Sequence, residues 1–349
     1  MQSGIFHTTY RKDMALRHTP AQKIRLLLVI LFVLIFPFVA DNYYLTLANQ
    51  IGIAVIGAVG LNILTGFTGQ ISLGTGAFLA VGAYSAGLLA IRLNMPMWIT
   101  IPAGAIMTAL VGAVFGIPSL RLKGLYLAIA TLAAQVIIIW VVTHWDAVTG
   151  GVDALFVKNY LWFGGKQVRF NEFKFYWIIM ALAALTVMAA VNLFRTRPGR
   201  AFIAIRDQDI AAEVMGVNVF RYKVAAFATS SFMIGLAGAL IAHWRQIVTW
   251  ERFTIEVSIL YLAMIIIGGL GSISGSIYGA IFMTLLPAFL LNVGQRLGGV
   301  IPAMDRLIPF IQQAVFGIVI VAFLIFEPEG IAKLWRNIKD YFRLWPFSY

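Results

Sequence analysis

The side chains that most often carry out chemistry in enzymes are sparse in this sequence. None of its four histidines has H-x-x-x-H or HExxH metal-site spacing, and no cysteine is present to complete a site. No G-x-S-x-G nucleophile elbow occurs either. His243 ends an apolar stretch, where packing is a simpler interpretation than ligation. We therefore expect no catalytic residue, no bound metal and no cofactor in this chain, and an enzyme is the weakest of the functional interpretations.

A single Gly-Lys pair is all that resembles a phosphate-binding loop. Tyr160 precedes Gly165 and Lys166 at the place where G-x-x-x-x-G-K-[ST] requires a glycine. Gln167 follows them where the motif requires a hydroxyl. If ATP powers this protein, a separate subunit must bind and hydrolyse it.

Uncharged polar side chains are concentrated in residues 62–76, NILTGFTGQISLGTG. The glycines interleaved with them make a poor continuous helix and a good broken one. In a membrane, backbone groups freed by such a break must be buried in protein or line a cavity. The segment is therefore either a site of close helix packing or the lining of a translocation path. The candidate path residues are Asn62, Thr65, Thr68, Gln70, Ser72 and Thr75.

The elements that position these residues are apolar. The chain is 61% hydrophobic and 11% charged, against about 45–50% and about 25% in a soluble domain. Ten stretches approach the roughly 17–25 residues that cross a bilayer as helix. They are residues 26–40, 45–65, 72–91, 97–118, 124–143, 175–194, 223–243, 254–270, 276–293 and 308–326. The first could be a signal peptide, but no clear A-x-A pattern ends it, and we interpret it as a retained span. The sequence predicts an all-α polytopic membrane protein with about ten transmembrane helices.

The basic residues give an orientation. With the N-terminus inside and ten alternating spans, most of the 26 Lys and Arg fall in cytoplasmic segments, as the positive-inside rule requires. Both termini are then cytoplasmic, and the net charge of +12 reflects topology rather than a nucleic-acid partner. The expected domains are a cytoplasmic segment (1–25), a transmembrane domain (26–326) and a cytoplasmic tail (327–349).

The expected spans carry no charged residue near their centres. Arg92 and Glu256 lie at span ends. Ion-driven carriers usually keep ionisable groups inside the membrane, so this class is less favoured. It stays open, because backbone oxygens alone can hold sodium.

Two connecting segments are longer than tight turns. Residues 144–174 mix glycine, aromatic and charged residues, as an external cap or docking surface would. Residues 195–222 predict one amphipathic helix at 199–216, with Pro198 in its first turn and Gly216 at its end. Its apolar stripe would be Ile203, Ile210 and Val214. Its charges are mixed, which suits a protein partner better than an anionic lipid surface.

A short internal similarity links two glycine-rich segments. Residues 66–74, GFTGQISLG, match residues 268–276, GGLGSISGS, at two glycines, an isoleucine and a serine. Glycine is common in the chain, so this similarity is either a repeat or an accident.

Three motifs in order resemble one known family. They are GLNILTGFTGQISLGTGAFLAVGAYSAGLL, RPGRAFIAIRDQDIAAEVMGVNVFRYKVAAF and MIIIGGLGSISGSIYGAIFMTLLP, within residues 60–330. The sequence is similar to the permease subunits of branched-chain amino acid ABC importers. The resemblance implies a type II, cobalamin-importer-like fold in the bacterial inner membrane. The implied partners are a second permease, two ABC ATPase subunits and a periplasmic substrate-binding protein.

The resemblance also implies that residues 195–222 contain the coupling helix that docks on the ATPase. The motif departs from the E-A-A-x-x-x-G importer loop, because Glu213 follows the two alanines instead of preceding them. The implied coupling residues are Gly199, Arg200, Ile203, Arg206, Asp207, Ile210, Glu213 and Gly216.

The implied substrate is a branched-chain or other hydrophobic amino acid. A path without fixed charge would not trap such zwitterions, but it would equally suit urea or short amides, which related permeases carry. The alternatives are therefore a urea or short-amide permease and, in a different class, an ion-coupled secondary transporter.

Overall fold

The computed structural model describes residues 20–118, 122, 124–160, 162, 167–168, 170–298, 304–327 and 329–344. The chain divides into two units, Met1–Thr46 and Leu47–Tyr349. The first unit contains α2 (Pro20–Val39), whose apolar part is Leu26–Val39, and the first turn of α3 (Asn42–Thr68). Between Leu26 and Val39, α2 consists of apolar residues, as expected of a helix in lipid.

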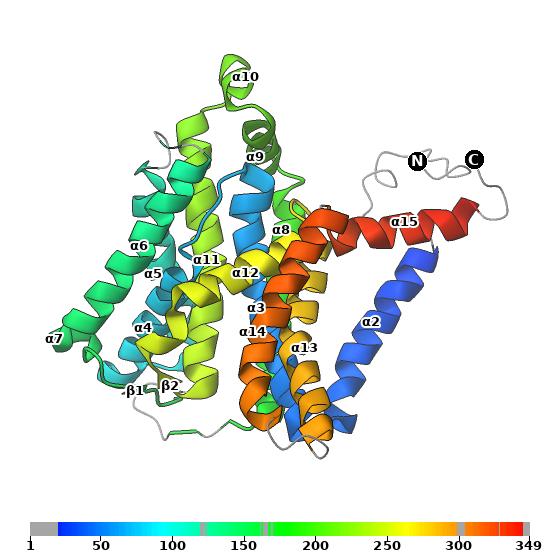
Figure 1. Cartoon of the computed structure of the whole chain (residues 1–349). Helices are drawn as coiled ribbons and strands as arrows, with labels where there is room; N and C mark the ends of the chain where they lie inside the picture. Colours follow the sequence, from blue (N-terminus) through cyan, green and yellow to red (C-terminus); the bar gives the residue numbers. More distant parts are fainter. Residues whose placement is uncertain are drawn as a thin grey trace. The chain divides into compact units, whose positions relative to one another are not determined.

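The second unit is built almost entirely of helices (Figure 1). After α3 they are α4 (Thr75–Arg92), α5 (Met97–Gly116), α6 (Leu125–His144), α7 (Asp146–Thr149), α8 (Glu172–Leu193), α9 (Arg197–Asp207), α10 (Asp209–Val214), α11 (Val219–Arg245), α12 (Ile255–Gly268), α13 (Ile273–Gly298), α14 (Met304–Phe326) and α15 (Ile331–Leu344). A 3-10 turn, η2 (Trp250–Phe253), precedes α12. Strands β1 (Leu155–Phe156) and β2 (Ile247–Val248) pair antiparallel.

The helices confirm a polytopic all-α membrane protein. In the described part of the chain, seven helices are long and apolar enough to cross a membrane, and an eighth candidate is the bent pair α14–α15. Every predicted span coincides with a helix, but α12 has only 14 residues. That is about 21 Å of helix, short of the roughly 30 Å of hydrocarbon. Ten complete crossings remain a prediction.

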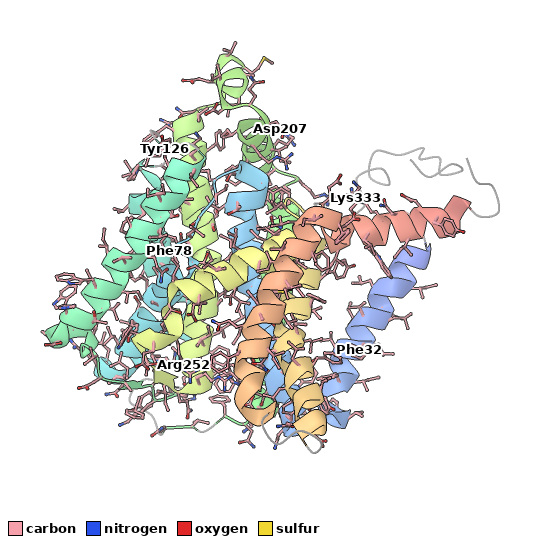
Figure 2. All side chains as sticks on the ribbon, viewed as in Figure 1. Phe32, Phe78, Tyr126, Asp207, Arg252 and Lys333 are labelled. Carbon is pink, nitrogen blue, oxygen red and sulfur yellow. The ribbon has the colours of Figure 1, made fainter. Side chains whose placement is uncertain are left out.

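Helix α11 lies at the centre of the core and packs against α4 and α5 through small residues. A Cβ added at Gly238 would stand 2.1 Å from the carbonyl oxygen of Leu79, and one at Gly82 would stand 2.2 Å from that of Gly235. Small residues let helix backbones approach closely where lipid supplies no hydrophobic drive for association. Phe78 fills the interior beside them, whereas Tyr126 points outward from α6 (Figure 2).

Replacing Gly238 by Ala is expected to destabilise the folded protein by about 1–3 kcal/mol, because α4 and α11 must separate to admit the methyl group. Thermal unfolding of the detergent-purified protein measures the effect. The matched control is Gly317→Ala in α14, where an added Cβ meets nothing within 4 Å. A midpoint that falls equally in both variants would contradict the packing argument.

The end of α11 is fixed by a buried polar cluster. His243 is fully buried, and its Nε2 lies 2.7 Å from Thr100 Oγ1 while its Nδ1 lies 2.7 Å from Asn159 Oδ1. The Asn159 amide also donates to the carbonyl oxygen of His243 at 3.1 Å. His243 therefore has the packing role that the sequence suggested. The cluster ties residues 144–174 to the helices.

Candidate coupling and translocation site

The glycine-rich segment is a helix break, as predicted. Helix α3 ends at Thr68, Gly69 adopts a left-handed φ of +69°, and the chain stays non-helical until α4 begins at Thr75. The Thr68 hydroxyl donates to the carbonyl oxygen of Leu64, which satisfies one acceptor in the last turn of α3. Glycine suits this position because a left-handed backbone carries no Cβ penalty there.

All six candidate path residues are buried in the protein, none more than 7% exposed. Asn62 is bound across the fold. Its side-chain nitrogen donates to Ser276 Oγ at 2.6 Å and to the carbonyl oxygen of Ser272 at 2.9 Å. Its side-chain oxygen accepts from the backbone N–H of Gly271 at 3.0 Å. Asn62 therefore joins α3 to the turn between α12 and α13.

The first turn of α4 is satisfied by side chains from two other helices. The N–H of Ala77 donates to Gln135 Oε1 at 2.6 Å, and the N–H of Gly76 donates to Ser258 Oγ at 2.7 Å. Gln135 also donates to the carbonyl oxygen of Phe253 at 2.6 Å. Helices α6 and α12 thus replace the water that would otherwise bind the helix end. Nothing in the sequence singled out Ser258 for this role.

Two polar atoms in this segment have no such partner. Thr75 Oγ1 and Gln70 Oε1 are buried without a hydrogen bond. Unpaired buried polar atoms are unusual and require an explanation. The packing interpretation accounts for Asn62 and for the first turn of α4, but it leaves these two atoms unexplained. The path-lining role of the six residues stays a prediction.

The break in α3–α4 lies against a second glycine turn. Gly271, between α12 and α13, has a φ of +72°, nearly that of Gly69. A Cβ added at Gly66 would stand 2.3 Å from the backbone nitrogen of Gly271. The two segments that resemble each other in sequence therefore meet in space.

Arg206 of α9 contacts both turns. Its Nη1 donates to the carbonyl oxygen of Gly66 at 3.3 Å. A Cβ added at Gly271 would stand 3.0 Å from that nitrogen, and one at Gly69 would stand 3.2 Å from Arg206 Cγ. The Arg206 Nε and Nη2 donate to Asp207 Oδ1 at 3.0 and 2.9 Å. One side chain thus connects the loop helix to the two breaks.

The loop itself differs from the prediction of one helix at 199–216. It forms two helices, because Gln208 is extended (φ −162°, ψ 107°) between α9 and α10. The predicted apolar stripe is wrong for the same reason. Ile210 and Val214 are 64% and 82% exposed, while Phe202 of α9 is buried. The predicted ends are confirmed: Pro198 lies in the first turn of α9, and Gly216, with a φ of +85°, follows α10.

Three contacts hold the loop helices on the spans. Gly199 packs so closely on the end of α8 that a Cβ would stand 2.3 Å from the carbonyl oxygen of Leu193. The ring of Phe202 meets Tyr222 edge-on at 6.3 Å. The nearly buried Lys223 of α11 pairs with Asp209 at 3.4 Å. Neither Phe202 nor Lys223 stands out in the sequence.

The remaining predicted coupling residues face outward or lie at the surface. Arg200, Asp207 and Glu213 are exposed, and Ile203 is half-buried. Asp207 lies at the end of the second unit where α9 and α10 lie (Figure 2), and its side chain is 63% exposed. The loop therefore has an inner side held by α8 and α11 and an outer side without a partner among the described residues.

Comparison with known proteins shows which protein family the chain belongs to. The family described as "Branched-chain amino acid transport system / permease component" matches residues 43–325. The chain belongs to this permease family. The permease is similar to the high-affinity branched-chain amino acid transport system permease protein LivM of Escherichia coli (strain K12), with 29% identity over 91% of the chain and 76% of that protein. It is also similar to the fructose import permease protein FrcC of Rhizobium meliloti, with 26% identity over 73% of the chain and 72% of that protein. No solved structure matches the chain.

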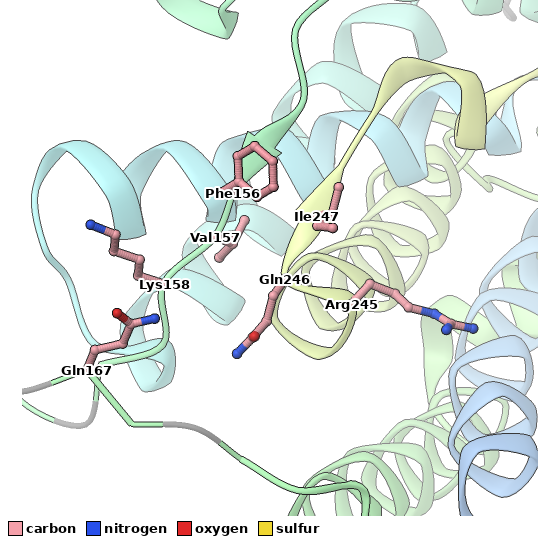
Figure 3. Close-up of a pocket in the computed structure, with 7 residues that line it drawn as sticks. All are labelled: Phe156, Val157, Lys158, Gln167, Arg245, Gln246 and Ile247. Carbon is pink, nitrogen blue, oxygen red and sulfur yellow. The ribbon is translucent and has the colours of Figure 1, made fainter. Parts of the chain in front are cut away.

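The permease has a small cavity at the end opposite to α9 and α10 (Figures 1 and 3). It measures about 290 Å³ and lies between β1, β2 and the end of α11. Its lining residues are Phe156, Val157, Lys158, Gln167, Arg245, Gln246 and Ile247. The lining is mixed and partly basic, and it includes part of the segment that the sequence indicated as an external cap or docking surface. That role stays a prediction.

The permease also fixes a carboxylate near this end. Glu172, the first residue of α8, accepts at Oε2 from the Asn49 amide at 2.7 Å and from the Trp244 indole at 2.8 Å. The Arg245 guanidinium lies 4.0 Å from the centre of the Trp244 ring. This network joins α3, α8 and α11 where all three helices reach the same end.

Proposed function

We propose that this permease is one subunit of an ATP-driven importer in a bacterial inner membrane. With a second, related permease it forms the path for branched-chain or other hydrophobic amino acids that a periplasmic binding protein delivers. Two separate ABC ATPase subunits hydrolyse the ATP. The substrate, the partner subunits and the kind of membrane go beyond what membership of the family establishes.

The observation that carries the proposal is the position of Arg206. It belongs to a helix pair whose outer side is free for a partner, and it contacts the breaks at Gly69 and Gly271. Movement of α9 is therefore transmitted directly to the segment that contains the six candidate path residues. Helix breaks held by a few hydrogen bonds are elements that can adopt two arrangements.

The orientation and the fold follow as parts of the same proposal. Loop 195–222 and the tail 327–349 lie on the cytoplasmic side, and loop 144–174 lies on the periplasmic side. Figure 1 supports this division, since α9, α10 and α15 lie at one end of the second unit and β1, β2 and α7 at the other. The ten-span type II fold is proposed for residues 26–326, with α12 as a short oblique helix.

The path is proposed to include the unpaired atoms of Thr75 and Gln70. They supply hydrogen-bonding groups without a fixed charge. Such groups suit a zwitterionic amino acid, which must bind weakly enough to leave the path again. The relative LivM is named for branched-chain amino acids, which favours leucine, isoleucine or valine over urea for this chain. The fructose permease among the relatives shows that the name of the family alone does not set the substrate.

The test is uptake by the reconstituted complex. Permeases, ATPases and binding protein in liposomes are expected to accumulate radiolabelled leucine only when ATP is supplied on the ATPase side. Radiolabelled urea, in parallel, separates the amide alternative. Uptake of leucine by the permease alone, driven by a sodium or proton gradient and indifferent to ATP, would establish the ion-coupled carrier instead.

A further inference from the structure

Helix α15 is not a continuation of the membrane crossing by α14. After Asp305 and Arg306 in its first turn, α14 continues to Phe326 without a charged residue, about 30 Å of helix, which already matches the roughly 30 Å of hydrocarbon. Charged Glu327 and Glu329 follow it, and the axes of Phe310–Phe326 and Ile331–Tyr341 differ by 51°. The chain therefore turns at the membrane surface.

Helix α15 is strongly two-sided. Leu334, Trp335 and Ile338 fall on one face at helical spacing, and they are 42%, 55% and 40% exposed. Lys333, Arg336 and Lys339 lie on the other side of the helix, together with Asp340. An apolar face with tryptophan opposite a basic face is the pattern of a helix that lies in a membrane interface.

The first turn of α15 is packed against the protein. Ala332 is buried, and Ile331 packs partly against the core. Glu329 pairs with Lys333 and lies 3.9 Å from Arg336, so an acidic residue neutralises part of the basic charge near the start of α15. Exposed apolar side chains also end α14, at Ile325 and Phe326.

Helix α15 differs in charge from α10, the other helix with exposed apolar side chains at this end. Around Ile210 and Val214, α10 carries the acidic residues Asp209 and Glu213, which anionic lipid repels. The described polar side of α15 is instead mainly basic, which complements the negative surface of a cytoplasmic leaflet. Lipid therefore fits α15, whereas a protein partner fits α10.

We propose that α15 lies in the headgroup–acyl boundary at the α9–α10 end of the protein and binds anionic lipid. Leu334, Trp335 and Ile338 enter the acyl region, and Arg336 and Lys339 contact phosphate headgroups. The assignment of this leaflet as cytoplasmic, and with it the negative charge of its surface, rests on the proposed function; the interfacial position of α15 does not.

The base of α15 lies on the turn that Arg206 also contacts. A Cβ added at Gly330, whose φ is +74°, would stand 2.6 Å from the backbone nitrogen of Gly269. Gly271, two residues later, lies against the Arg206 guanidinium. The lipid-bound helix and the coupling helix thus share one backbone turn.

The test uses the absence of cysteine in the natural chain. Ile338→Cys and Arg336→Cys, two residues apart on opposite sides of α15, each carry a spin label in the complete transporter. Ile318→Cys on the exposed face of α14 is the lipid reference. The membranes are phosphatidylethanolamine–phosphatidylglycerol (3:1) liposomes, and the readout is collision of the label with oxygen or with a nickel complex.

The label at 338 is expected to collide several-fold more with oxygen than with the nickel complex, relative to a label in water. The label at 336 is expected to collide several-fold more with the nickel complex than the label at 338 does. If the nickel complex reaches the labels at both positions, α15 lies in water. If the label at 338 is shielded from both reagents, protein covers the apolar face of α15. If both labels favour oxygen, α15 crosses the bilayer. Each of these results overturns the proposal.

The anionic component has its own readout. Arg336→Gln together with Lys339→Gln is expected to lower the oxygen preference of the label at 338 at least threefold in the phosphatidylglycerol liposomes. Pure phosphatidylcholine is expected to lower it similarly without any substitution. An unchanged oxygen preference in both cases would overturn anionic-lipid binding.

Discussion

Replacing Ile210 and Val214 by Asp is expected to abolish binding of the ATPase subunits to the permease. The two side chains lie one helical turn apart on α10 and are largely exposed, so they form the apolar part of the outer side of the loop. Aspartates there would require burial of two unpaired charges at the contact. They would also add to the negative charge of Asp209 and Glu213. Copurification of tagged permease with its ATPase measures the loss, and ATP-dependent leucine uptake should fall to background.

The control for this pair is Val152→Asp. Val152 is also an exposed valine, but it lies between α7 and β1, and these two elements are at the end opposite to α10. This variant is expected to copurify with the ATPase at the level of the natural protein. Because both sites are exposed, neither substitution disturbs the core, and size-exclusion chromatography should show folded permease in each case. Full ATPase recovery with the α10 variant would place the docking surface elsewhere.

Local composition was sufficient to predict the helices and the break at Gly69. Long apolar stretches predict helices in lipid, and glycines interleaved with hydroxyl residues predict an interruption. The ends of α9 and α10 were also predictable, because Pro198 and Gly216 have strong positional preferences. These features depend on residues close together in the sequence.

The interruption at Gln208 was not predictable in the same way. Neither proline nor glycine marks it, and the flanking residues are compatible with a helix. What the structure adds is the pairing of Asp209 with Lys223, fourteen residues away on α11. A tertiary contact can override local helix propensity. Such a contact cannot be predicted from the periodicity of apolar residues in the sequence.

The internal similarity is explained only in part by the structure. Gly69 and Gly271 share a left-handed backbone, so the matched glycines serve the same kind of turn. Beyond them the two segments diverge, because Ser72 lies in the non-helical stretch while Ser274 lies in the first turn of α13. The match therefore reflects two similar turns that Arg206 brings together, and it does not extend to the elements that follow.

Removing Arg206 and Asp207 tests the function of that contact. The double variant Arg206→Ala, Asp207→Ala is expected to keep ATP hydrolysis within about twofold while leucine uptake falls by about tenfold or more, since one charge-assisted hydrogen bond contributes about 1.5–3 kcal/mol. The loss is specific because Phe202, Gly199 and Lys223 still hold α9 and α10 on the spans. Docking is retained, and what is lost is the contact of Arg206 with the two turns, including its bond to the Gly66 carbonyl, together with its pairing with Asp207. Hydrolysis and uptake are measured in the same proteoliposomes.

The matched control is Arg197→Ala at the start of the same helix. Arg197 is exposed and is not one of the implied coupling residues, and no atom of it is among the nearest neighbours of Gly69 or Gly271, so its removal changes local charge away from both glycine turns. It should leave the ratio of substrate moved to ATP hydrolysed unchanged. Uptake that is unaffected in the double variant would show that α9 does not act through Arg206. If ATP hydrolysis, complex assembly and uptake are all lost, Arg206 acts in ATPase docking instead. A residue that only transmits the movement of α9 is not needed for the contact between the loop helices and the ATPase.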